Sequence, residues 1–154
     1  YSHSFCPSIS EVQYEFYNEE IALAHEIGVG IQPFKKEVFF QRTSVLGEEY
    51  MGEGCNVPFE EQWEVGFGTG PFTIQNRYVT EDVPVGCHVY HELGKKFGVA
   101  TPVIDSMIVL GGVMNKTNYF ETGLKLSDLG IEHLSKEQLL TYLREGDYIE
   151  PKEG

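Results

Sequence analysis

The stretch TPVIDSMIVLGGVMN, residues 101–115, indicates the fold class most directly. Thr101 followed by Pro102 is typical of a helix N-cap with proline at the first helical position. The residues that follow are apolar on almost every helical face, which predicts a helix buried at the centre of a domain. Asp105 is conspicuous there, because it is the only ionisable side chain in the stretch.

Helical patterns also occur on both sides of this central stretch. Ser8 and Glu11 form a capping box, and the apolar stripe that follows predicts a helix ending at about Ile27, before Gly28. Four further helices are expected from apolar spacing, an initial proline or a capping box at Ser135 and Gln138. They cover residues 33–47, 83–98, part of 118–131, and 135–146.

The rest of the chain has weaker patterns. Residues 47–70 are rich in glycine and aromatic side chains and are expected to form loops around a short helix at 59–65. A short strand is expected at 72–79. The sequence therefore predicts a mainly α, compact, bundle-like multi-helix domain over residues 1–154, a length that suffices for one proper core.

Composition restricts the classes of partner. The chain has 24 acidic and 11 basic side chains and a net charge of −13, which disfavours nucleic acid and anionic membrane surfaces. A small anionic substrate would need a local basic spot. There is no apolar run long enough to cross a bilayer and no secretory signal pattern, so a cytoplasmic location is expected. The first residue is Tyr1, not Met, which suggests a processed product or an excised fragment.

Three short motifs suggest chemistry that their contexts disfavour. VGFGTG, residues 65–70, lacks the flanking strand and helix of a phosphate-binding loop. In HVYHE, residues 88–92, the histidine spacing suits a metal poorly, so no metal is expected; a surface histidine, or for His88 a place on a pocket wall near Asp82, is favoured. Cys87 and His88 diverge on a helix and make a poor nucleophile pair. The three cysteines form no CxxC pair, so reduced thiols are expected.

The stretch RYVTEDVPVG, residues 77–86, has two interpretations. One of the carboxylates of Glu81 and Asp82 could cap a helix starting at Pro84, which is a purely structural role. Alternatively, Arg77 on an extended segment could bind a substrate carboxylate with its planar guanidinium, while an acid orients a catalytic histidine. Spacing alone leaves both open.

Several motifs also carry a family resemblance. RYVTEDVPVG, the V-x-TP-x-ID pattern at 99–105, and the NYFETG, LSDLG and LLTYL motifs occur in order over residues 77–146. Together they resemble the C-terminal α-helical domain of the octopine and nopaline (opine) dehydrogenases. Residues 1–28 are compatible with that family, and residues 30–70 are unmatched. The resemblance implies a fold like the C-terminal domain of 6-phosphogluconate dehydrogenase.

The resemblance also implies a function. It implies an NAD- or NADP-dependent oxidoreductase that joins the amino group of an amino acid to a 2-oxo acid and reduces the imine. The cofactor would lie chiefly on an N-terminal Rossmann domain that this chain lacks, and the enzyme is expected to be a homodimer. Asp82 matches the acid that orients the family's catalytic histidine, and Arg77 matches the arginine that binds the substrate carboxylate. His88 is a further candidate for substrate binding.

The family's histidine motif, N-x-x-x-H-P, is absent from this sequence. The chain alone is therefore expected to be inactive. Two alternatives stay open: a non-catalytic helical module for interaction or dimerisation, and a domain of another two-domain dehydrogenase, such as a relative of ketopantoate reductase or glycerol-phosphate dehydrogenase.

Overall fold

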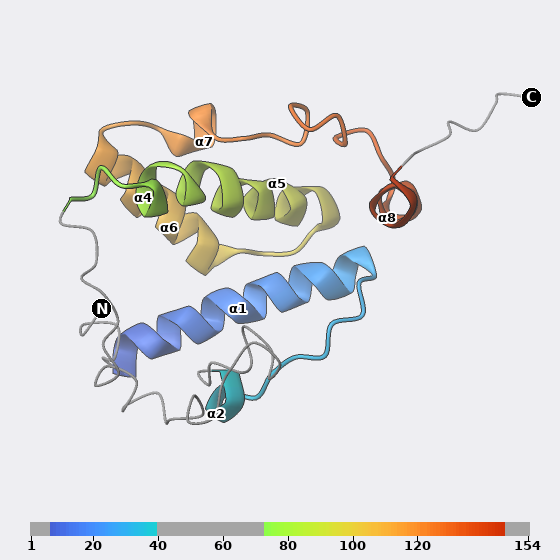
Figure 1. The fold of residues 1–154 in the computed structure, drawn as a ribbon, viewed down its shortest axis with the longest axis horizontal. Helices are drawn as coiled ribbons and strands as arrows, with labels where there is room; N and C mark the ends of the chain where they lie inside the picture. The colour runs from blue at the N-terminus through green and yellow to red at the C-terminus, as the bar shows by residue number, and fades with distance from the viewer. Residues whose placement is uncertain (1–6, 40–72, 147–154) are drawn as a thin grey trace, which may run out of the picture. The chain divides into compact units, whose positions relative to one another are not determined.

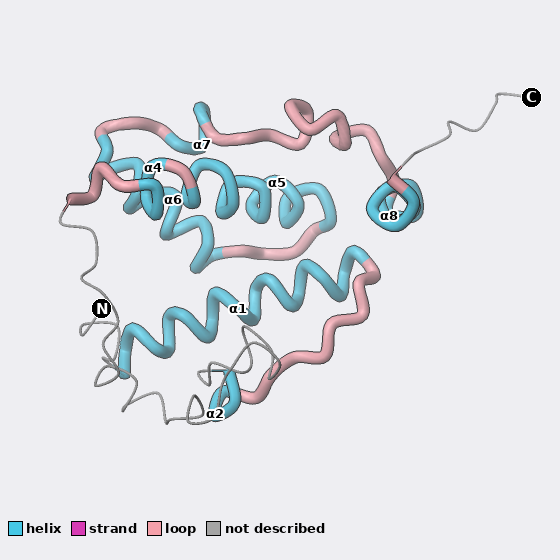
Figure 2. The backbone as a smooth tube through the Cα atoms, viewed as in Figure 1, coloured by secondary structure: helices cyan, strands magenta, loops and turns pink. Residues whose placement is uncertain are grey.

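The computed structural model describes residues 7–39 and 73–146, which form helices joined by loops (Figure 2). No strand occurs among these residues, which confirms the mainly α fold class. The helices carry the labels of Figure 1. They are α1 (Pro7–Ile27), α2 (Lys36–Phe39), α4 (Arg77–Thr80), the π-helical η4 (Val83–Cys87), α5 (His88–Phe97), α6 (Pro102–Asn115), α7 (Tyr119–Thr122) and α8 (Lys136–Glu145).

The chain divides into two compact units, and the division falls within α1. The first unit comprises Tyr1–Asn18 and Gln32–Thr73, and the second comprises Glu19–Ile31 and Ile74–Gly154. A single domain over residues 1–154 stays a prediction. The second unit carries Arg77, Asp82 and His88, the residues that the sequence singled out.

In the first unit, an aromatic cluster connects α1 to the segment before α2. The hydroxyl of Tyr14 donates to the carbonyl of Phe34 at 3.1 Å, and the amide of Phe34 donates to the hydroxyl of Tyr17 at 2.8 Å. The ring of Tyr17 also stacks on Phe39, with centroids 4.5 Å apart. Because these bonds hold Phe34 outside any helix, α2 begins at Lys36 and not at Pro33. The remainder of the helix expected at 33–47, the loops and helix expected at 47–70, and VGFGTG lie outside the described residues.

In the second unit, α4, η4 and α5 follow one another along a nearly continuous helical path. α5 and α6 lie side by side, and α7 packs against α6 and η4 (Figure 1). The strand expected at 72–79 is wrong, since Arg77–Thr80 is a helical turn. The cause of this helical turn is local. The side chain of Asn76 accepts a hydrogen bond from the amide of Tyr78 at 3.2 Å and so caps the turn.

Helix α6 is buried on one side only. Ile104 and Ile108 are 0% and 1% exposed, and Gly111 and Gly112 are buried with them. The opposite side is apolar but exposed, at Val109, Leu110, Val113 and Met114. The expectation of burial on every side is therefore wrong, because an all-apolar helix has no polar stripe to mark which face is exposed.

The N-terminus of α6 is capped from a distant part of the chain. Thr101 occupies the N-cap position as expected, but its side chain makes no capping hydrogen bond. The amides of Val103 and Ile104 donate instead to the two carboxylate oxygens of Glu19 on α1, at 2.8 and 2.9 Å. A carboxylate there satisfies two orphan amides and complements the helix dipole.

The helix ends expected from sequence are largely confirmed. α1 ends at Ile27 and α5 at Phe97, each followed by a left-handed glycine, Gly28 or Gly98. α1 begins one residue early, at Pro7, so Ser8 lies within its first turn. The capping box of α8 is present, and α8 packs through Leu139 against Ile27 and Leu134, forming a small core.

Candidate functional site

The π-helical segment η4 gives the region around Asp82 its local geometry. A π turn holds one residue more than an α turn, and such turns occur frequently at functional sites. The amide of His88 reaches back to the carbonyl of Val83, and the carbonyl of Pro84 accepts instead from the amide of Leu124 at 2.8 Å. The turn thereby joins this helical path to the segment after α7.

Arg77 and Asp82 lie on successive turns of this path, and both are exposed. Arg77 begins α4, and its Nη2 lies 3.7 Å from Oε1 of Glu81, one helical turn away. The extended segment expected for Arg77 is therefore wrong. At 3.7 Å with both side chains well exposed, this pair is weak and leaves the guanidinium able to bind other carboxylates.

Asp82 does not act as the helix cap that one interpretation expected. Its backbone is itself helical, with φ −63° and ψ −34°, and its side chain makes no capping hydrogen bond. The carboxylate stays exposed at the start of η4.

Asp82 is one of a group of four side chains, together with Glu20 on α1, Cys87 on η4 and Tyr90 on α5. Burial, and then the nearby carboxylates of Glu20 and Asp82, raises the pKa of the Cys87 thiol to about 11. The hydroxyl of Tyr90 on α5 is hydrogen bonded to the carboxylate of Glu20 on α1. Burial raises the pKa of Glu20, and burial together with Glu20 raises the pKa of Tyr90 to about 12. Cys87 is therefore a thiol at neutral pH, with the carboxylates of Glu20 and Asp82 nearby.

His88 lies in the interior of the second unit and is 1% exposed. Its Nδ1 lies 2.8 Å from the carbonyl of Leu124, and its Nε2 lies 3.2 Å from the carbonyl of Phe120. Both ring nitrogens thus face backbone carbonyls, so an N–H on either nitrogen has an acceptor. A Cβ on Gly123 would lie 2.5 Å from the ring, so only glycine fits there. In this conformation a ligand reaches His88 only if residues 120–124 move.

His91 and Asp105 form an imidazole–carboxylate pair between α5 and α6. Nδ1 of His91 lies 2.8 Å from Oδ1 of Asp105, and the hydroxyl of Thr101 donates to the same oxygen at 3.1 Å. The ring of His91 contacts Phe120 edge-on, with centroids 4.9 Å apart. The sequence marked Asp105 as conspicuous without identifying its partner.

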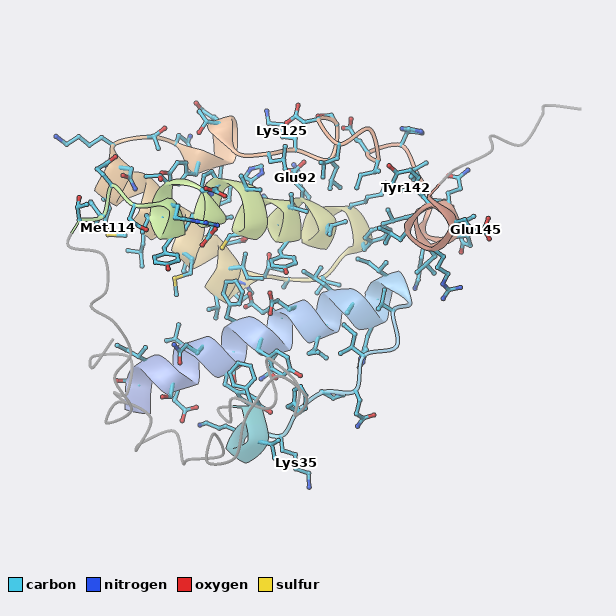
Figure 3. All side chains as sticks on the ribbon, in the orientation of Figure 1. Lys35, Glu92, Met114, Lys125, Tyr142 and Glu145 are labelled. Carbon is cyan, nitrogen blue, oxygen red and sulfur yellow. The ribbon has the colours of Figure 1, made fainter. Side chains whose placement is uncertain are left out.

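A shallow hollow of about 370 Å³ lies beside the exposed side of α6. Its lining is mainly apolar and comes from α6, from the residues that follow it and from α7. Figure 3 shows Met114 near the C-terminal end of α6. It also shows Glu92 on α5 and Lys125 on the segment after α7. Among the described residues, no group of three metal-binding side chains gathers anywhere. Within that same part of the chain, no helix is long and apolar enough to cross a membrane.

Sequence reasoning missed Glu19, Glu20 and Tyr90 altogether. The two glutamates are adjacent in α1, where an acidic pair usually marks a solvated face, and Tyr90 is one of nine tyrosines in the chain. No motif in the sequence marks these residues, and both glutamates only precede Leu23 and Ile27 of the apolar stripe expected for this helix.

Comparison with known proteins bears on the family. A model of the alpha-helical domain of the NAD/NADP octopine/nopaline dehydrogenases matches residues 1–115. This range includes residues 30–70, which the motifs left unmatched, and ends before the last motifs, at 118–143. The opine dehydrogenase of Arthrobacter sp. (strain 1C) is 25% identical over 138 residues, which is 88% of this chain and 36% of that protein. The chain thus spans about a third of that relative's length. Since the family model covers well over half of the chain, this chain belongs to the NAD/NADP octopine/nopaline dehydrogenase family, a family of oxidoreductases, as its alpha-helical domain.

Proposed function

We propose that this chain is the substrate-binding domain of an NAD- or NADP-dependent opine dehydrogenase. The observation that carries the proposal is the family match over residues 1–115, which includes the Arg77–Asp82 motif in full. The relative that spans most of the chain is itself named an opine dehydrogenase.

The reaction joins two small acids through nitrogen. The amino nitrogen of an amino acid attacks C2 of a 2-oxo acid, and loss of water leaves a C=N double bond. When bound, a nicotinamide cofactor would supply the hydride for that carbon, and a proton would complete the secondary amine. One 2-oxo acid, one amino acid in its ammonium form, one reduced cofactor and one proton give one opine, one oxidised cofactor and one water.

In this proposal Arg77 binds the carboxylate of the 2-oxo acid. A planar guanidinium matches a carboxylate with two parallel N–H donors, and the ion pair of Arg77 with Glu81 is weak enough to be exchanged. Arg77 would then be the local basic spot that a chain of net charge −13 needs for an anionic substrate.

Asp82 orients the histidine that transfers the proton. An imidazole beside a carboxylate is held in one tautomer and becomes a stronger base. The exposed carboxylate of Asp82, with no capping role, suits such a partner. The histidine itself would come from the part of the protein outside this chain, as would most cofactor contacts. His88 stays a predicted substrate contact that depends on movement of residues 120–124.

A homodimer is part of the same proposal, and the exposed side of α6 supports it. Residues 106–115 carry no charge, so two strongly acidic copies could approach there without repulsion. We expect the intact protein to have twice its monomer mass by light scattering; a monomer at working concentration would rule the homodimer out.

The test of the proposed activity uses the intact protein. With pyruvate, each common amino acid and NADH or NADPH in turn, we expect cofactor oxidation that requires both acids, and a secondary amine of the summed mass less one oxygen. The isolated 154-residue chain serves as the control and should be inactive. Cofactor oxidation with the oxo acid alone, or none with any pair, would refute the proposal.

A further inference from the structure

The π turn of η4 sets the rotational position of Asp82 relative to α5. An α-helix turns by roughly 100° per residue, and a π turn holds one residue more than an α turn. If Val83–Cys87 became α-helical, Asp82 would therefore turn by roughly 100° about the helical path relative to α5. The direction of its carboxylate thus depends on the persistence of the π turn.

A hydrogen bond from outside the helical path keeps this turn from becoming α-helical. In an α turn, the amide of His88 would donate to the carbonyl of Pro84, four residues back. Here that amide donates to the carbonyl of Val83, and the carbonyl of Pro84 accepts from the amide of Leu124 at 2.8 Å. Leu124 thus occupies the acceptor that α-helical geometry requires.

The side chain of His88 holds Leu124 in that position. Its Nδ1 lies 2.8 Å from the carbonyl of Leu124, and its Nε2 lies 3.2 Å from the carbonyl of Phe120. The ring is 1% exposed, so these two carbonyls take the place of water as its hydrogen-bond partners. A Cβ on Gly123 would lie only 2.5 Å from the ring, which shows how closely the segment packs on it. The ring therefore joins the start of α5 to both ends of residues 120–124.

We propose that His88 is a positioning residue for the proposed reaction and acts on Asp82 through Leu124 and the π turn. The inference rests on the proposed function and deepens it, because it adds to the site a residue that touches no substrate. While residues 120–124 keep their positions, this role replaces a direct contact between His88 and substrate.

Arg77 is held separately, and this gives the test its contrast. The turn that carries Arg77 has its own cap at Asn76. The side chain before that cap, Gln75, donates a hydrogen bond to the side chain of Asn115 on α6. Loss of the π turn therefore misplaces Asp82 more than Arg77.

The test measures kcat and KM in the intact protein, with pyruvate and the amino acid that gives the highest rate. His88→Leu removes both ring nitrogens and keeps an apolar side chain in their place. We expect kcat to fall about tenfold or more and the KM for pyruvate to change less than about twofold. A raised KM with unchanged kcat would mean that His88 contacts substrate, and would overturn the inference.

His25→Leu is the matched control for that measurement. Nε2 of His25 also meets a backbone carbonyl, that of Ile31 at 3.0 Å, but at the end of α1. Both constants should stay at their wild-type values. An equal fall of kcat in the two variants would overturn the inference.

A double-mutant cycle with Asp82 separates positioning from a general loss of structure. If His88 acts through Asp82, His88→Leu should lower kcat less than about twofold in the Asp82→Asn background. A larger unfolded fraction would instead lower kcat by the same factor in both backgrounds. Equal factors would therefore overturn the inference.

Two conservative variants decide should His88→Leu fail to fold. The side-chain amide nitrogen takes the place of Nδ1 in His88→Asn and of Nε2 in His88→Gln. Because the contact with Leu124 holds the turn, His88→Asn should retain more of the wild-type kcat than His88→Gln. The reverse order, or wild-type kcat in His88→Gln, would overturn the inference.

Hydrogen–deuterium exchange of the intact protein reports on the turn without any turnover. The amide of Leu124 should exchange about tenfold faster or more in His88→Leu than in wild type, because its hydrogen bond to Pro84 then opens more often. Unchanged exchange would overturn the inference and leave the proposed function intact. No turnover by wild type with any pair of acids would instead overturn the proposed function, and this inference with it.

Discussion

His88 illustrates what a single residue contributes to this domain. A histidine next to a cysteine and three residues before another histidine invites a chemical role, and the sequence could not decide for or against it. Its ring is buried with both nitrogens at backbone carbonyls of the segment after α7. Those partners lie more than 30 residues away in sequence, so no local pattern predicts them.

Gly123 provides a test of this packing. Its φ of −70° and ψ of 162° suit any residue, so the cost of Gly123→Ala comes from space alone. The new Cβ would lie 2.5 Å from Cγ of His88 and 2.7 Å from the carbonyl of Tyr119. We expect a loss of about 1–3 kcal/mol in the free energy of unfolding, measured by denaturant titration.

Gly30→Ala is the control for that measurement, since no described atom lies within 4 Å of its Cβ position. It should be neutral or stabilising by about 0.4–1 kcal/mol. Equal effects at the two glycines would contradict the packing described for His88.

At the scale of elements, local signals predicted well where the determining residues are close in sequence. The capping box of Ser135 and Gln138, and the glycines after α1 and α5, located helix ends because each acts within a turn or two. The prediction of a strand at 72–79 was wrong, because the aromatic and β-branched residues there favour a strand in the sequence pattern and hide the signal of the single capping residue, Asn76. The cap of α6 could not be predicted, since Glu19 lies 84 residues before Val103.

Replacing that distant cap tests its contribution to the fold. Glu19→Ala removes two charge-assisted hydrogen bonds to the amides of Val103 and Ile104. We expect the free energy of unfolding to fall by about 1–3 kcal/mol, because the orphan amides of α6 then lose their partner. Glu15→Ala, at an exposed position of the same helix, should change it by less than about 0.5 kcal/mol. If the two variants were equally stable, Glu19 would not be a structural cap.

For the whole molecule, short sequence motifs predicted more than hydrophobic periodicity and composition did. Periodicity and composition gave the mainly α class, whereas the family came from motifs such as RYVTEDVPVG, and the family match then covered residues 1–115. The burial of α6 could not be predicted, because an apolar helix without a polar stripe does not indicate which side faces a partner. The candidate site was predicted only in part: Arg77 and Asp82 came from the motif, while Glu20 and Tyr90 become visible only when α1 and α5 are brought together.

The central claim is that Arg77 and Asp82 belong to one active site, in which Arg77 binds the substrate carboxylate and Asp82 orients the catalytic histidine. The most direct measurement is the steady-state kinetics of the intact protein with each residue replaced. Arg77→Ala should raise the KM for the 2-oxo acid about tenfold or more with a smaller effect on kcat, and Asp82→Asn should lower kcat by about a hundredfold or more with a smaller effect on KM. Arg144→Ala, on the last turn of α8, should leave both constants unchanged. Wild-type kinetics in both Arg77→Ala and Asp82→Asn would contradict the account.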